Sequence, residues 1–212
     1  MKIIPTHGIT CCEAVPGSDH WFWGSDYAHG DLYEAEELFR DGHTLRPNRL
    51  IFLHAPEGRV WEPIPAGDDQ CFGRPVFDNG QFYILRSDFL REVLEVFSAR
   101  PDREGAALVA SLPRSAVVDC YNLRLFPGGP LLAHEEAGHR FHILWPQEAS
   151  FPVAAEETFL CRRGERLYFS RWWEDPDYHE ELVVRRWSDG EVMERIPGSA
   201  TELPDGSWWL LQ

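Results

Sequence analysis

The chain has 212 residues, of which 43% are hydrophobic and 26% charged, proportions typical of a globular protein. Its net charge of −15 would repel the phosphates of nucleic acids and of anionic membranes, so we expect neither as a partner. No stretch approaches the roughly 18 apolar residues of a membrane-spanning helix, and the opening MKIIPTHGITCC lacks the apolar core of a signal peptide.

The cysteine pattern predicts free thiols. The number is odd, two are adjacent and no CxxC motif occurs, which is typical neither of a disulfide framework nor of a zinc site. We therefore expect a reducing compartment, the cytoplasm, and no metal or other cofactor. The cysteines are Cys11, Cys12, Cys71, Cys120 and Cys161.

A glycine followed seven or eight residues later by a proline recurs along the chain. Glycine permits a positive φ in a tight turn, and proline cannot donate to a sheet ladder, so each phrase predicts an outer strand that begins after a turn. These strands would follow Gly8, Gly58, Gly105, Gly138 and Gly190.

A second phrase, a turn residue before an apolar strand, alternates with the first. Gly80, Asn122, Gly164 and Gly206 precede such strands and stand 42 residues apart in succession. Gly30, before DLYEAEEL, is the best fifth member. The dipeptides Asn-Gly and Asp-Gly at two of these positions are typical of hairpin turns.

Together the two phrases predict units of four antiparallel strands, which is the size of a propeller blade. The clearest unit reads CFGRPVFD, QFYILRS, REVLEVFSA and AALVASLP. A closing unit would take two strands from MKIIPT and ITCCEAV at the start of the chain, and two from TELPDG and SWWLLQ at its end. Sharing one unit between the ends would remove an exposed sheet edge.

Two segments fit this frame less well. Residues 30–39, GDLYEAEELF, contain good helix formers, and Leu32, Ala35 and Phe39 fall near one helical face. Residues 87–97, SDFLREVLEVF, could be a capped helix. The repeat predicts strands for both segments, and the number of units falls if both are helices.

The whole chain therefore resembles β-propeller repeat proteins, with a strand order similar to that of kelch-type blades. A kelch-like double glycine appears at Gly128-Gly129. The resemblance implies an all-β fold with one domain over residues 1–212, a five-bladed propeller of four-stranded antiparallel blades whose closing blade is shared between the N- and C-termini. No specific family is indicated, so no functional residues can be carried over.

The resemblance also implies that a ligand would bind at the mouth of the central channel. The connections from each fourth strand to the next blade, and from each second to third strand, would meet there. Their carboxylates are Asp19, Asp68, Asp69, Glu156 and Glu157. Solvated turn carboxylates are the simpler interpretation. A pair that serves as acid and nucleophile, or acid and base, of a glycoside hydrolase is the alternative.

Aromatic residues in the same connections favour binding. Trp172 and Trp173 stand near Asp175 and Tyr178 in a polar loop, where they could stack on a sugar or contact a cation. Tryptophans packed between blades are the competing interpretation. His20 and Trp21 are expected at the mouth as well.

Two sets of potential metal ligands are interpreted as structural. His139 and His142 in EEAGHRFHILWP would point to opposite faces of a strand, and His134 would lie across the same hairpin, so we predict a hairpin and no metal site. The thiols at positions 71, 120 and 161 would lie on innermost strands, where they could hold a soft metal or act as small apolar filler. Crowding near the channel favours filler.

The sequence thus predicts a non-catalytic protein that binds a ligand at the channel mouth. The ligand would be a sugar-like small molecule, or a basic peptide or protein surface. A glycoside-processing enzyme and a protein-interaction scaffold remain alternatives, because propellers have many functions. The predicted ligand-binding residues are Asp19, His20, Asp69, Arg114, Glu157, Trp172, Trp173 and Asp175.

Overall fold

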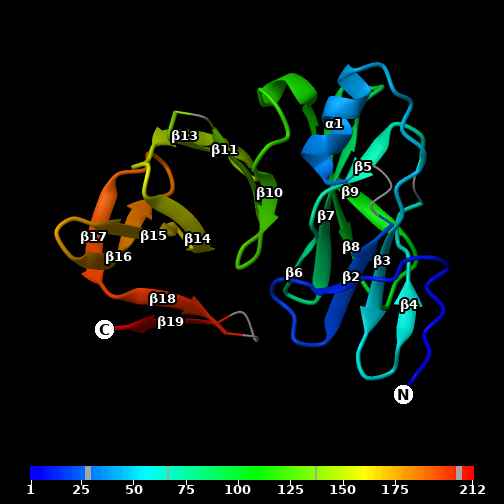
Figure 1. Ribbon diagram of the computed structural model, residues 1–212, viewed down its shortest axis with the longest axis horizontal. Coiled ribbons are helices and arrows are strands. Elements are labelled where there is room, and N and C mark those ends of the chain that lie inside the picture. Colours follow the sequence, from blue (N-terminus) through cyan, green and yellow to red (C-terminus); the bar gives the residue numbers. More distant parts are fainter. Residues whose placement is uncertain (27–29, 66, 137, 204–206) are drawn as a thin grey trace.

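The computed structural model describes residues 1–26, 30–65, 67–136, 138–203 and 207–212. The fold is all-β, as predicted, and is built from successive antiparallel sheets with one α-helix among the described residues (Figure 1). No helix in these ranges is long and apolar enough to cross a membrane.

The first two sheets take up the N-terminal half of the chain. The first sheet has the order β1 (Glu13–Ala14), β2 (Trp21–Ser25), β3 (Leu50–His54) and β4 (Arg59–Trp61). Helix α1 (Leu32–Arg40) connects β2 to β3. The second sheet has the order β5 (Gln70–Phe72), β7 (Gln81–Asp88), β8 (Val93–Ala99) and β9 (Ala106–Pro113), with the short β6 (Val76–Asp78) also paired to β7.

The C-terminal half begins after the short 3-10 turn η1 (Arg114–Ala116). The third sheet consists of β10 (Leu123–Phe126), β11 (Leu131–Glu136), β12 (Arg140–Trp145) and β13 (Ala149–Pro152). The fourth consists of β14 (Glu157–Arg163), β15 (Arg166–Glu174), β16 (Tyr178–Arg186) and β17 (Val192–Pro197). The hairpin of β18 (Ser199–Glu202) and β19 (Trp208–Leu211) follows.

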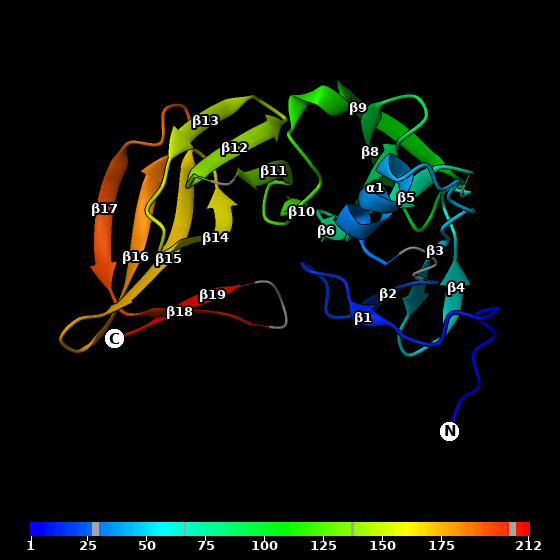
Figure 2. The same cartoon turned by 45° about the horizontal axis from the view of Figure 1, so that its top comes forward.

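The sheets follow one another along an arc, with the first sheet at one end and the β18–β19 hairpin at the other (Figure 2). In each of the third and fourth sheets the first strand, β10 or β14, lies on the inner side and the last strand, β13 or β17, on the outer side (Figure 2).

Each pair of successive sheets among the first four encloses its own hydrophobic core. Phe52 of the first sheet packs against Phe82 of the second, with ring centroids 4.2 Å apart. Leu85 and Leu125 belong to a core shared by the second and third sheets and α1. Phe141 of the third sheet lies 5.2 Å from Phe169 of the fourth. Burying such a side chain contributes about 1.5–3 kcal/mol, so these faces hold the arc together.

The turns between first and second strands converge on one cavity of 290 Å³. Residues in or next to these turns in each of the four sheets line it, together with the hairpin: Gly17, Asp78, Pro127, Gly128, Cys161, Arg162, Arg163 and Trp208. The space is tight, because a Cβ atom at Gly17 would stand 2.1 Å from the carbonyl oxygen of Phe77. Residues near these turns in the four sheets therefore share one cavity.

The strand predicted for residues 30–39 is wrong, because most of this segment is helix α1. Asp31 is the N-cap, and its carboxylate accepts hydrogen bonds from the amides of Tyr33 and Glu34, both at 2.9 Å. The Glu34 carboxylate accepts in return from the Asp31 amide at 2.9 Å. This capping box and the buried Leu32 and Ala35 stabilise a helix where the repeat predicted a strand.

Residues 87–97 form no helix, and the two strands that the repeat predicted there are present on either side of a turn. β7 extends through Asp88 and β8 begins at Val93, so the segment is a hairpin turn flanked by two strand ends. Glu92, the last residue before β8, has a φ of 54°, a left-handed conformation that is common in turns.

In the third unit each strand lies one position earlier in its sheet than the repeat predicted. LRLF after Asn122 is the first strand, β10, rather than a second strand, and RFHILW after Gly138 is the third strand, β12, rather than a fourth. The hairpin turn is made instead by Gly128 and Gly129, which have φ values of 78° and 90°. The fourth strand is β13, a segment assigned from the sequence to a connection.

The closing unit predicted from the two chain ends is not formed. ITCCEAV contains β1, which pairs with β2 in the first sheet, and residues 1–12 have no strand. Gly24 of β2 allows this course, since a Cβ there would stand 2.7 Å from the Cys11 carbonyl oxygen. Among the described residues, β18 and β19 pair with each other alone. Gly206, a predicted turn residue, lies outside the described ranges.

Candidate functional site

Two adjoining cavities open on the inner side of the first four sheets, where second strands end and the next first strands begin. The larger, of 430 Å³, lies between the first three sheets, and its walls include Glu13, Tyr33, Arg74, Tyr121, Asn122 and Arg124. The smaller, of 330 Å³, lies over the third and fourth sheets, and its walls include Tyr121, Asn122, Glu135, Glu136, His139 and Glu157. Tyr121 and Asn122 belong to both, so we treat them as one site, the mouth site.

Two tyrosines from distant parts of the chain meet at the mouth site. The capping box at Asp31 fixes the first turn of α1 and with it Tyr33. Tyr121 follows a turn in which its amide donates to the Asp119 carboxylate at 2.9 Å. The two rings make an edge-to-face contact with centroids 5.4 Å apart. A hydrogen bond to Glu37, and that residue's charge, raise the pKa of the Tyr33 phenol, which stays protonated at neutral pH.

The two arginines of the larger cavity are each paired with a glutamate. Arg74 lies 3.1 Å from the Glu13 carboxylate, and Arg124 lies 3.6 Å from that of Glu135. Both pairs are partly exposed and therefore contribute little to stability. Their importance is chemical, because these pairs offer hydrogen-bond donors and acceptors to the cavity beside the Asp31 carboxylate, which accepts from the backbone of α1.

Each carboxylate of the smaller cavity also has a basic neighbour. Glu157 is buried and accepts two hydrogen bonds from the Arg185 guanidinium, both at 2.9 Å. Glu136 lies 3.3 Å from the ring of His142. Glu135 pairs with Arg124 across the boundary between the two cavities. These carboxylates are therefore each held by an existing contact with a basic side chain.

The three histidines of the β11–β12 hairpin do not converge. His134 is buried, with Nε2 3.6 Å from Asp119, whereas His142 lies between Glu136 and Glu148 at 3.3 Å from each. His139 occupies the turn, exposed and with a φ of 61°. The predicted hairpin is confirmed. In the described part of the chain no group of three His, Cys, Asp or Glu residues has a metal-binding arrangement.

Three thiols, those of Cys71, Cys120 and Cys161, are buried and protonated, but Cys120 lies in the turn before β10 and not on an innermost strand as predicted. Burial raises the pKa of Cys71 to about 12 and the pKa values of Cys120 and Cys161 to about 11. A protonated thiol is a poor nucleophile and a poor metal ligand, which agrees with the interpretation as apolar filler. Cys11 and Cys12 are exposed and free.

The eight residues predicted from the sequence do not gather in one place. Asp19 and His20 lie in the β1–β2 turn, on the side of the arc opposite to the mouth site, because ITCCEAV supplies a first strand and not a fourth. Asp69 organises loops, as its carboxylate accepts from the Leu45 amide at 2.8 Å. Arg114 forms an ion pair with the buried Glu36 of α1. Glu157 lines the mouth site, where it is held by Arg185.

Trp172, Trp173 and Asp175 lie at the tip of the β15–β16 hairpin. Trp172 is 50% exposed, while Trp173 stacks on His179 with ring centroids 5.2 Å apart. The tip belongs to neither cavity of the mouth site. Binding by these residues stays a prediction.

Sequence reasoning did not single out Tyr33, Tyr121, Asn122 or the Arg–Glu pairs. Tyr33 was assigned to a strand, although the capping sequence Asp31-x-x-Glu34 could have indicated the helix that positions it. Tyr121 and Asn122 precede β10, the first and innermost strand of the third sheet. The repeat assigned this strand as a second strand, so the sequence did not predict that the two residues lie at the mouth site.

Comparisons with known proteins leave the family open. No family model matches the chain, and no curated protein matches it in sequence. A solved structure of a candidate 6-phosphogluconolactonase from Bacteroides uniformis matches with a TM-score of 0.38 and 13% sequence identity. The match covers 91% of this chain, which spans 60% of that protein. A likeness this weak establishes neither the fold nor the activity.

Proposed function

We propose that the protein is a non-catalytic binding protein and that its ligand, a neutral, polyhydroxylated, sugar-like molecule, occupies the mouth site. The observation that carries the proposal is the contact between Tyr33 and Tyr121 on the wall of the 430 Å³ cavity. Cavities of this size, with aromatic surface and a few convergent polar groups, are typical of small-molecule sites.

The polar groups support a neutral ligand. Arg74 and Arg124 each stand beside a glutamate, so a charged ligand would have to compete with an existing ion pair. Hydroxyl groups can donate to the carboxylates and accept from the guanidinium groups without separating them. The amide side chain of Asn122 adds one more donor and acceptor at the boundary of the two cavities.

We infer further that the sheets are blades of a propeller. The convergence of the inner turns on one cavity supports this arrangement, with β18 and β19 as the inner half of a fifth blade. The free state of all the cysteines supports a reducing compartment, the cytoplasm, as the protein's location.

A panel of neutral mono- and oligosaccharides, screened by thermal unfolding, tests the proposed function. A sugar present at about 100 times its dissociation constant adds about 2.7 kcal/mol of stability, which a melting curve detects. Tyr121→Ala should weaken the binding of that sugar about tenfold, because it removes the exposed ring of the site.

Tyr178→Ala is the matched control. Tyr178 is 61% exposed and Tyr121 is 59% exposed, but Tyr178 lies at the start of β16, away from the mouth site. Equal loss of binding in the two variants, or a panel in which no sugar raises the melting temperature, would contradict the proposal.

A further inference from the structure

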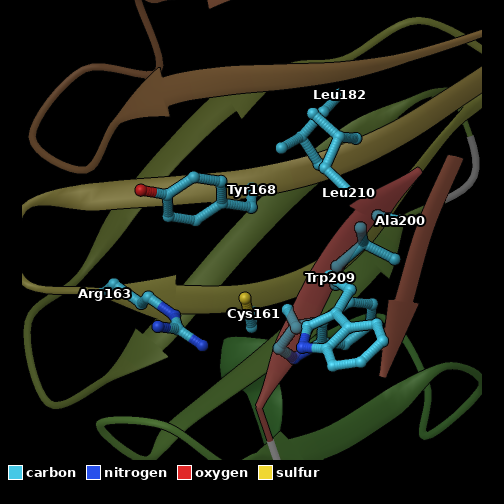
Figure 3. Close-up of a pocket in the computed structure, with 9 residues that line it drawn as sticks. Cys161, Arg163, Tyr168, Leu182, Ala200, Trp209 and Leu210 are labelled. Atoms are coloured by element: carbon cyan, nitrogen blue, oxygen red, sulfur yellow. The ribbon is translucent and has the colours of Figure 1, made fainter. Parts of the chain in front are cut away.

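The space between the fourth sheet and the β18–β19 hairpin contains a cavity with an apolar wall. The cavity has a volume of 200 Å³, and apolar side chains from both elements surround it (Figure 3). The fourth sheet contributes Leu160, Cys161, Arg163, Tyr168 and Leu182, and the hairpin contributes Ala200, Trp208, Trp209 and Leu210.

This apolar cavity adjoins the 290 Å³ cavity enclosed by the inner turns. Cys161, Arg163 and Trp208 line both. The two cavities therefore form one site with an apolar chamber under the hairpin and a polar chamber at the centre of the arc, which we call the hairpin site. It opens by the inner turns, opposite to the mouth site.

Arg162 and Arg163 give the polar chamber a positive charge. Within the described residues, no carboxylate lies at ion-pair distance from either guanidinium, although the chain carries 35 acidic and 20 basic residues. Arg162 lies over the Trp187 ring, 3.1 Å from its centroid, and its Nε donates to the Gly164 carbonyl at 2.9 Å. In Figure 3 the Arg163 guanidinium points from β14 toward the cavity.

Among the residues that the structure describes, one carboxylate, that of Asp78, lies on the wall of the polar chamber, and it is already engaged. Asp78 accepts a hydrogen bond from the Gly129 amide at 3.3 Å and another from the Asn79 side chain at 2.7 Å. It forms no ion pair with Arg162 or Arg163 in the part of the chain that the structure describes. Arg162 uses one donor on the Gly164 carbonyl and Arg163 contacts the Cys161 side chain, and their remaining guanidinium donors are available to a ligand.

We propose that the hairpin site binds a small amphipathic anion. Its carboxylate or phosphate group pairs with Arg163 and Arg162, and its apolar or aromatic group fills the chamber between Leu160, Leu182 and Trp208. Arginine suits this role, because its planar guanidinium recognises both anions by paired hydrogen bonds. Such a ligand replaces the missing core between the fourth sheet and the hairpin.

Isothermal titration with three phenyl compounds tests this proposal: phenyl phosphate, phenylacetate and the uncharged 2-phenylethanol. We expect at least one anion to bind and 2-phenylethanol to bind at least about tenfold more weakly, since it lacks the ionic contact. Whichever anion binds more tightly identifies phosphate or carboxylate as the preferred group. Equal affinity for the uncharged compound, or no binding of either anion, would overturn the proposal.

Arg163→Gln should weaken anion binding about tenfold or more while leaving the fold intact, because Arg163 is exposed. Arg166→Gln is the control. Arg166 is Arg163's neighbour across the β14–β15 ladder, but it lies outside both chambers. Tyr121→Ala should leave anion binding unchanged, so a failure of the mouth site and a failure of the hairpin site give different results. Retained affinity in folded Arg163→Gln would sink the proposal.

Discussion

Glu157 and Arg185 form a buried ion pair at the beginning of the fourth sheet. The side chains are 1% and 10% exposed, and Arg185 donates further to the Gly190 carbonyl at 2.7 Å. A buried charge that loses its partner is costly, whereas an exposed pair contributes little. Glu157 was predicted as a ligand-binding residue, but its contacts indicate that it supports the wall of the mouth site.

Glu157→Gln should therefore lower the free energy of unfolding by about 3–5 kcal/mol, because Arg185 remains buried without a counter-charge. Chemical denaturation measures the change. Glu194→Gln, which removes the carboxylate of the exposed Arg166–Glu194 pair, should cost less than about 1 kcal/mol. Similar decreases in the free energy of unfolding in the two variants would contradict the prediction that the buried pair contributes more to stability than the exposed one.

Thiol chemistry should separate the cysteines into two classes. Cys11 and Cys12 should react with a thiol reagent in the native protein, while Cys71, Cys120 and Cys161 should react after denaturation. Burial raises the folded-state pKa of the last three from 9.0 to about 11 or 12, so the folded protein keeps protons that the unfolded chain releases.

Stability should consequently be insensitive to these thiols below pH 9.0 and fall as pH rises from there toward 11. Urea midpoints measured across this range test the expectation. The variant with Ser in place of the exposed Cys11 and Cys12 should show the same fall with pH. A midpoint that rises with pH would contradict the assigned directions.

At the scale of the elements, α1 is the main departure from the repeat. The apolar spacing of residues 30–39 suited a helix, but the repeat frame outweighed it in the sequence interpretation, and the local capping box decided the outcome. The same element carries Tyr33 to the mouth site. Because α1 was assigned as a strand, the sequence did not predict that Tyr33 contacts Tyr121.

Asp31→Ala should destabilise the protein by about 1 kcal/mol, since it removes the N-cap that accepts from two amides. It should also weaken sugar binding, because the first turn of α1 positions Tyr33. Denaturation and titration measure the two effects. Asp41→Ala, at the other end of the helix, is the control, and an equal effect there would argue against the role of the cap.

The β18–β19 hairpin is the element with the least support. It is a two-stranded sheet, and such hairpins are marginally stable unless they pack against another surface. Its amides should exchange with solvent faster than those of β7 and β8, which lie inside a larger sheet. Hydrogen exchange followed by mass spectrometry tests this, and equal protection in both regions would contradict it.

At the scale of the whole molecule, the regular features were predictable and the exceptions were not. Turn residues such as Gly80 and Gly164 have positive φ values and precede second strands, so their spacing revealed the four-stranded units. The third unit was displaced because Asn122, with a φ of 56°, follows the same local rule at a different place in the sheet. Local turn chemistry sets where a strand begins. Pairing across the sheet sets whether that strand is the first, second, third or fourth of its sheet.

The site was less predictable than the fold for a related reason. The mouth site joins residues from β1, α1, β5 and β10, which meet because the first three sheets share the inner side of the arc. A list of loop carboxylates and tryptophans cannot show which side chains are already engaged, as Glu157 and Asp69 are. That information lies in long-range contacts rather than in spacing.

Mapping of amide chemical shifts during titration with a sugar that raises the melting temperature tests the central claim most directly. The mouth site predicts that the largest changes fall on Tyr33, Tyr121 and Asn122, with little change at the β15–β16 tip. Changes concentrated at Trp172 and Trp173, with none at Tyr121, would place the ligand on the hairpin tip and contradict the mouth site.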